Sequence, residues 1–189
     1  LALLAAPLEL LVEHKNEISD CPNFAPELVP ALNELVTMAS WDWNTGWKVF
    51  TDLARDLQRR EFTSNDARYH ARLVRVLGRM PEGAGQILNL LKGIYRGTDR
   101  GLMQWADASI VELAGEMRLK EAVPLIIDRF YVGNESVLDE CGPLLAKIGG
   151  DEVVEAGSEC WANGNEGIRF IFTEALDDIH TDLSAETCL

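Results

Sequence analysis

The sequence predicts an all-α protein, a right-handed α-solenoid of about five helical hairpins in which residues 1–189 form one repeat domain. The chain aligns with itself without gaps, at a spacing of 31 residues, over Ala106–Met117, Val137–Ile148 and Ile168–Ile179. Apolar residues recur at helical spacing within these segments, and no segment of convincing length alternates as a strand would. A repeat built from helices accounts for these observations.

Further copies define the two parts of each unit. Lys120–Glu135 aligns with Asp151–Glu166 at the same spacing, and both segments end in Gly-Asn-Glu. A fourth copy, Tyr69–Met80, lies 37 residues before Ala106–Met117. Its apolar side chains fall on one helical stripe, which comprises Tyr69, Leu73, Val76, Leu77 and Met80. Each unit is therefore predicted to be two helices joined by a turn.

The helical pairs follow one another along the chain. The predicted pairs are 7–19 with 24–40, 45–60 with 65–80, 84–96 with 101–117, 120–132 with 135–148, and 151–162 with 166–180. The repeat is clear over 65–180 and divergent over 1–64, where Pro26 and Pro30 constrain the second helix. One short pair cannot bury its apolar face alone, so neighbouring pairs are expected to stack into a continuous core.

Turns and chain ends add two expectations. Gly133-Asn134 and Gly164-Asn165 are expected to close their helices in the left-handed conformation. Leu1 is not Met, and Ser184 precedes a new segment in the manner of a helix N-cap. We therefore expect the chain to be a fragment of a longer solenoid.

Two segments carry a family resemblance. The pattern EAVPLI, a turn, and a helix ending in LLAKIG resembles the HEAT-like repeats related to those of phycobilisome lyases. IRFIFTEALDDI keeps that repeat's hydrophobic-Arg start at Ile168-Arg169 and its Ala-Leu-x-x-Ile finish. The resemblance covers residues 65–180 and implies a scaffold that binds proteins. The chain departs from the pattern at Leu138, at Pro143, which is expected to interrupt a helix, and at Asp177.

Charge and composition argue against several classes of protein. The chain has 31 acidic and 17 basic residues, and its formal net charge of -14 opposes binding to free nucleic acid or to an anionic membrane. No run approaches the roughly 20 apolar residues that span a bilayer. The four cysteines have neither CxxC nor zinc-site spacing, so they are expected to be reduced thiols, which favours a cytoplasmic protein.

Catalytic motifs are not found in the sequence. The histidines His14, His70 and His180 are isolated, without the His-Glu pairs of HEAT-like di-iron hydroxylases, and neither a phosphate loop nor a GxSxG elbow occurs. We therefore expect no cofactor, no metal ion and no enzymatic activity. Asp178, His180 and Asp182 are an alternative set of metal ligands, for which a solvated acidic tail is the favoured interpretation.

Charges are segregated along the chain, and arginines line one predicted helix. Residues 51–104 hold 10 basic and 6 acidic side chains, whereas residues 105–189 hold 5 basic and 18 acidic ones. The arginine row, at steps of four, three and four residues, consists of Arg68, Arg72, Arg75 and Arg79. This spacing places all of them on one face of a helix.

The favoured interpretation of the arginine row is a ladder of salt bridges. In a right-handed array the second helix of each pair lines the concave side, next to the second helix of the following pair. Arg75 is then placed to pair with Glu112, and Arg79 with Glu116. Each such exposed pair contributes about 0.2–1 kcal/mol.

The candidate binding residues combine arginine and tryptophan. Arg68 and Arg72 lack acidic equivalents in the next repeat, and with Trp105 they are a candidate anchor for an acidic or carboxylate-bearing peptide. The segment WDWNTGW, if extended, places Trp41 and Trp43 on the same side as an aromatic platform for a peptide. The favoured alternative for these tryptophans is a hydrophobic plug between poorly matched repeats.

The leading hypothesis is a non-enzymatic scaffold whose concave face binds a protein or peptide. An accessory or lyase-type subunit of an enzyme is one alternative, and it is suggested by the repeat resemblance. An acidic inhibitor or immunity-type protein is another, in which residues 105–189 cover a basic partner. High salt would sharply weaken such a complex, because its attraction depends on opposite charges.

Overall fold

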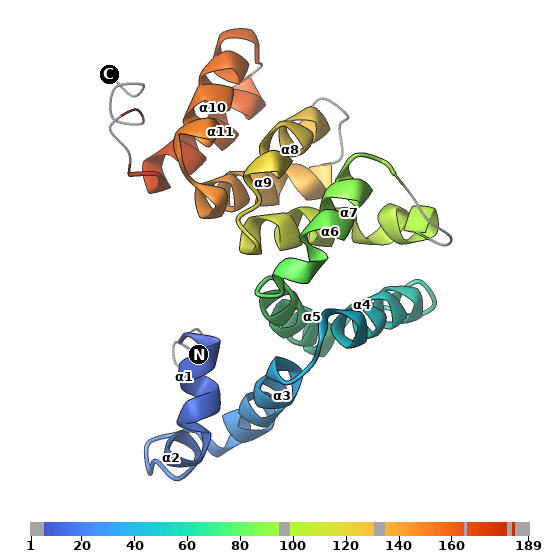
Figure 1. The fold of residues 1–189 in the computed structure, drawn as a ribbon, viewed down its shortest axis with the longest axis vertical. Helices are drawn as coiled ribbons and strands as arrows, with labels where there is room; N and C mark the ends of the chain where they lie inside the picture. Colours follow the sequence, from blue (N-terminus) through green and yellow to red (C-terminus); the bar gives the residue numbers. More distant parts are fainter. Residues whose placement is uncertain (1–5, 95–98, 131–134, 165, 181–182, 184–189) are drawn as a thin grey trace.

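The structure, a computed structural model, describes residues 6–94, 99–130, 135–164, 166–180 and 183, without the side chains of 99–105, 130 and 135–140. The prediction of an all-α protein is confirmed, because this part of the chain contains helices and no strand (Figure 1). The α-helices are α1 (Leu8–Glu13), α2 (Lys15–Ser19), α3 (Val29–Ala39), α4 (Trp43–Leu57), α5 (Ser64–Leu77), α6 (Ala84–Leu91), α7 (Asp99–Glu116), α8 (Val123–Phe130), α9 (Glu135–Ile148), α10 (Asp151–Asn163) and α11 (Glu166–Asp178). Short 3-10 turns precede three of them: η2 (Pro26–Leu28), η3 (Pro81–Gly83) and η4 (Lys120–Ala122).

The helices occur in the predicted order, with two differences inside helices. The expected helix over 7–19 is divided into α1 and α2 at His14, where φ is -102° and ψ is 19°. The expected interruption at Pro143 is wrong, since α9 continues through this residue. Pro143 is exposed, so its ring needs no space inside the core, and its missing N–H removes one backbone hydrogen bond from α9.

Gly164 differs from its expected conformation. Its φ is -83°, outside the left-handed region, and its position is crowded instead. A Cβ atom there would lie 2.6 Å from the carbonyl oxygen of Cys160 and 2.8 Å from Cγ2 of Ile168. A glycine is therefore needed for the close approach of α10 and α11. Asn165 and the turn Gly133-Asn134 lie outside the described residues.

Successive second helices pack against one another in chain order. Helix α5 contacts α7, α7 contacts α9, and α9 contacts α11, while α8 contacts α10 in a second row. Glycines allow these close contacts: a Cβ atom at Gly78 would lie 2.4 Å from Cβ of Glu116, and one at Gly115 would lie 2.7 Å from Leu144. Figure 1 shows the result, with α1–α3 towards one end of the long axis and α10–α11 at the other.

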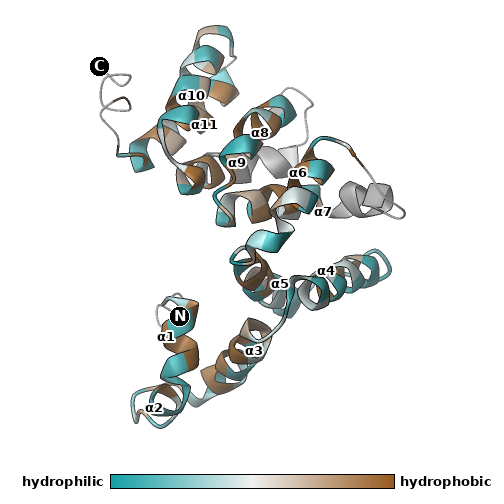
Figure 2. Ribbon diagram, in the orientation of Figure 1, coloured by the Kyte–Doolittle hydropathy of each residue, from teal (hydrophilic) through white to brown (hydrophobic). Residues whose placement is uncertain are grey.

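The core repeats with the sequence. Leu73, Ile110, Cys141 and Phe172 are equivalent in the sequence alignment, and each side chain is fully buried. They belong to one large cluster that extends from α4 to the residue after α11. A second, smaller cluster joins α1 and α3 to Val76 of α5. Figure 2 shows apolar residues recurring along the described helices between polar ones. None of the helices described is both long enough and apolar enough to span a bilayer.

Candidate binding surfaces

The arginine row of α5 faces the N-terminal helices. Its contacts are the ion pairs Arg72–Glu34 and Arg79–Glu9 and a hydrogen bond from Arg75 to the carbonyl oxygen of Ala6. Glu34 lies in α3 and Glu9 in α1, so three of the four arginines hold the preceding unit of the chain. Partial burial and the nearby Arg79 lower the pKa of the Arg75 guanidinium from its usual value. The row therefore has a structural role at the junction of the two apolar clusters.

One predicted salt bridge of the ladder, Arg79 with Glu116, is replaced by other ion pairs. Glu116 pairs with Lys147, the equivalent residue one repeat later, and Arg79 pairs with Glu9. Both members of the predicted pair Arg79–Glu116 thus have other partners. Arg75 lies close enough to Glu116 for that charge to affect its pKa. The predicted pair of Arg75 with Glu112 stays a prediction.

The predicted peptide anchor is only partly described. Arg68 is exposed on α5 and makes no ion pair with the described residues. Arg72 is largely buried beside Glu34, with which it pairs. Trp105 belongs to α7, but its side chain lies outside the described residues. Of the three anchor residues, Arg68 is therefore the one with a charge open to a partner.

The WDWNTGW segment contains the start of α4, two residues before the predicted start at residue 45, so it is not extended from Trp43 onward. Helix α4 begins at Trp43, because Asp42 caps it by accepting a hydrogen bond from the Thr45 N–H at 2.7 Å. The Trp43 ring is buried, and its Nε1–H donates to Oε1 of Gln86 at 3.0 Å. A Cβ atom at Gly83 would lie 2.3 Å from this ring. The geometry supports the hydrophobic plug for Trp43.

The other tryptophans of this segment extend the packing. Trp47 stacks between Trp43 and Phe50, with ring centroids 5.3 Å and 5.2 Å apart. Trp41 is half-buried and packs against both apolar clusters. The segment therefore joins the divergent N-terminal helices to the regular repeats, as a plug would.

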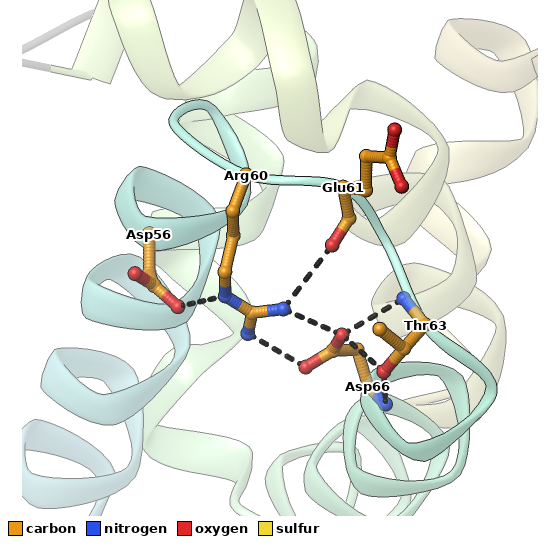
Figure 3. A network of polar contacts seen from close by, with 5 residues as sticks. All are labelled: Asp56, Arg60, Glu61, Thr63 and Asp66. Atoms are coloured by element: carbon orange, nitrogen blue, oxygen red, sulfur yellow. Dashed lines mark hydrogen bonds and ion pairs between the residues drawn. The ribbon is translucent and has the colours of Figure 1, made fainter.

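The turn between α4 and α5 is held by a polar network (Figure 3). Arg60 donates from Nε to Asp56 at 2.6 Å and from two nitrogens to the Asp66 carboxylate at 2.7 Å each. Asp66 and Thr63 form a capping box at the start of α5, and Arg60 also reaches the carbonyl oxygen of Glu61. The pKa of Asp66 is far below its usual value, chiefly because of Arg60 and then Thr63. The bidentate ion pair fixes the path of residues 58–63.

Replacing Asp66 with Asn should flatten the acid limb of the stability curve. Because the folded-state pKa of Asp66 is lowered, its contribution is present above about pH 4 and is lost as the pH falls towards the folded value. Between pH 5 and pH 2, the urea midpoint of the native chain should fall more steeply than that of Asp66→Asn. Arg60→Ala should also reduce the fall of the urea midpoint between pH 5 and pH 2, by a smaller amount. Parallel curves for all three proteins would contradict this role.

The helical pair α10–α11 exposes acidic and aromatic side chains together. Its carboxylates, all exposed, are Asp151, Glu152, Glu155, Glu159, Glu166, Glu174, Asp177 and Asp178. Arg169 is the one basic residue of this pair, and its guanidinium lies 5.9 Å from the ring centroid of Trp161. Trp161 is 46% exposed and Phe170 is 65% exposed. We call these carboxylates with Trp161 and Phe170 the α10–α11 surface.

The exposure of Phe170 was missed by the sequence interpretation, although a signal for it exists. Its equivalents in the repeat alignment are Asp139, Ala108 and Ala71, which are polar or small. A phenylalanine at a position that other repeats fill with such residues is not required by the core. Glu166 and Glu174 lie one helical turn on either side of Phe170, so the three share one face of α11.

The described part of the chain shows neither a metal-binding cluster nor a disulfide bond. No three His, Cys, Asp or Glu side chains there gather in a way that would hold a metal ion, and Asp182 lies outside the described residues. Among the described residues, Cys21, Cys141 and Cys160 form no disulfide bond. No protein-family description, curated protein or solved structure matches the chain. The functional conclusion therefore rests on the exposed surfaces.

Proposed function

We propose that the chain is a non-enzymatic scaffold, a right-handed superhelix of HEAT-like hairpins that binds a protein or peptide. The successive packing of α5, α7, α9 and α11 carries the proposal. Each helical pair contacts its sequence neighbours, so the array stays extended and presents long faces for a partner. The described cysteines form no disulfide bond, which fits a reducing compartment such as the cytoplasm.

The partner chemistry that fits best is a basic segment bound to the α10–α11 surface. Eight exposed carboxylates lie on the same two helices as two exposed aromatic rings. Arg169 is the one basic residue of these helices, and Lys120 of η4 pairs with Glu152. Lysine or arginine side chains of a partner would pair with the carboxylates, and their stems and cations would pack on Trp161 and Phe170. This assignment favours the acidic surface over the Arg68 anchor, since Arg72 is already paired with Glu34.

A displayed library of random 12-residue peptides tests the partner class directly. Binders selected on the full chain should be rich in Lys and Arg, and their affinity should fall as salt is raised. Glu166→Lys with Glu174→Lys should weaken the selected peptides about 10-fold, because two attractive charges become repulsive. Phe170→Ala should weaken them as well.

Glu82→Lys with Glu121→Lys is the matched control, since it makes the same change in net charge at exposed residues of η3 and η4. This control should change affinity by less than about 2-fold. Equal losses in both double variants would show that total charge alone attracts the peptides and would contradict the α10–α11 surface. Selection of acidic peptides, with binding lost in Arg68→Glu, would place the site on α5 instead.

A further inference from the structure

An apolar cavity lies between α4, the α4–α5 turn, α5 and α7. Its volume is about 230 Å³, and its walls include Phe50 of α4 and Phe62 of the turn. Phe62 is 59% exposed at the rim, and the Arg60–Asp66 ion pair holds the turn that carries it. Two polar side chains also line the cavity, His70 from α5 and Ser109 from α7.

His70 is the unusual member of this lining. Its ring lies 6.0 Å from that of Phe50, and its Nε2 atom is buried without a hydrogen-bond partner among the described residues. Burial lowers the pKa of the imidazole, so the ring is neutral near pH 7. A buried polar nitrogen without a partner costs free energy that a ligand or a ring rotation towards a ligand would recover.

The size and walls of the cavity select the kind of ligand. An apolar cavity of about 150 Å³ holds a benzene molecule, so the larger volume here holds one ring with a few further atoms. Aromatic walls favour an aromatic ring, which packs in offset or edge-on geometry. The described side chains that line the cavity include no ionised group, so an ion would lose its hydration without compensation from them.

We propose that this cavity binds a phenol-like ligand, a single aromatic ring whose hydroxyl group bonds to His70 and Ser109. A hydroxyl both donates and accepts, so it satisfies either tautomer of a neutral imidazole as well as a serine hydroxyl. The site lies on α4, α5 and α7 and does not depend on the proposed basic partner of α10–α11. The same chemistry is available from a free phenol or from a tyrosine side chain.

NMR of the full chain labelled with ¹⁵N-histidine tests the site with p-cresol, toluene and N-acetyl-tyrosinamide. Saturable shifts of the His70 nitrogens are expected with p-cresol, while His14 and His180, which lie outside the lining, serve as internal controls. Toluene, which lacks the hydroxyl, should bind about 3- to 10-fold more weakly. Binding of N-acetyl-tyrosinamide would identify a tyrosine side chain as an accepted source, and its exclusion would identify a free small molecule.

His70→Phe keeps an aromatic ring and should remove the preference for p-cresol over toluene, and Ser109→Ala should reduce it. Ligand affinities of these variants can be followed by the ¹H shifts of the ligand. Equal affinity of the native chain for p-cresol and toluene would overturn the proposal. So would the absence of a saturable His70 shift, a measurement on the native chain that does not depend on how the variants fold.

Discussion

Trp43→Ala is expected to lower the free energy of unfolding by about 3–5 kcal/mol, the range for removing a large buried aromatic side chain. The Trp43 ring fills the space over Gly83, which has no side chain that could move into the cavity. The variant also leaves Oε1 of Gln86 without its donor and removes the stack with Trp47. Urea unfolding followed by circular dichroism measures the loss.

Two further variants separate packing from binding at this position. Trp43→Phe keeps most of the ring and should cost less than Trp43→Ala, because the lost contribution is chiefly the Nε1–H bond to Gln86. Trp161→Ala removes the same side-chain type from a half-exposed position and should change stability by about 1 kcal/mol or less. If Trp43→Ala left stability unchanged and abolished peptide binding, the aromatic platform would replace the plug.

The repeat and its core were accessible from the sequence because helical periodicity is a local property. The alignment placed Leu73, Ile110, Cys141 and Phe172 at one position, and all four are fully buried. The glycine at Gly115 was also visible as part of the repeat, but its reason, the 2.7 Å approach to Leu144, depends on a helix in the next unit. Periodicity thus identifies a buried face without naming the neighbour that covers it.

The arginine row shows the same limit at the candidate site. A step of three or four residues put Arg72 and Arg79 on one face of α5, as observed. Arg79 was expected to pair with Glu116 of the following repeat, and Arg72 was expected to bind a partner. Glu34 and Glu9 of the preceding helices take that place. Residues 1–64 show no clear repeat, so the self-alignment of the sequence could not identify these glutamates as partners of α5. Tertiary packing decides whether the arginines of α5 pair with the preceding or the following unit.

The start of α4 was predictable in principle from a local signal. Asp42 precedes Trp43-Asn44-Thr45, which is a standard N-cap arrangement, whereas the predicted helix began at residue 45. The exposed Phe170 of the α10–α11 surface could have been found by comparing equivalent positions of the repeats. Phe170 becomes noticeable when each residue is compared with its equivalents, since only the repeat shows which positions face outward.

Phe172→Ala and Phe170→Ala form a matched pair, because the same side chain is removed two residues apart on α11. Phe172 is fully buried, and a Cβ atom at Gly157 of α10 would lie 2.7 Å from its ring. Phe172→Ala should therefore leave a cavity that Gly157 cannot fill and should cost about 3–5 kcal/mol. Phe170 is 65% exposed, and Phe170→Ala should change stability by about 0.5 kcal/mol or less.

The part of the chain that Phe172→Ala destabilises is as informative as the size of its stability loss. Stability in a repeat array is carried by contacts between neighbours, so Phe172→Ala should speed amide exchange in α10 and α11 and leave α1–α3 almost unchanged. Phe170→Ala should leave exchange unchanged throughout while it weakens the basic peptides. Faster exchange over the whole chain in Phe172→Ala would contradict an array of neighbour contacts, because it would show that distant helices unfold with α11 as one unit.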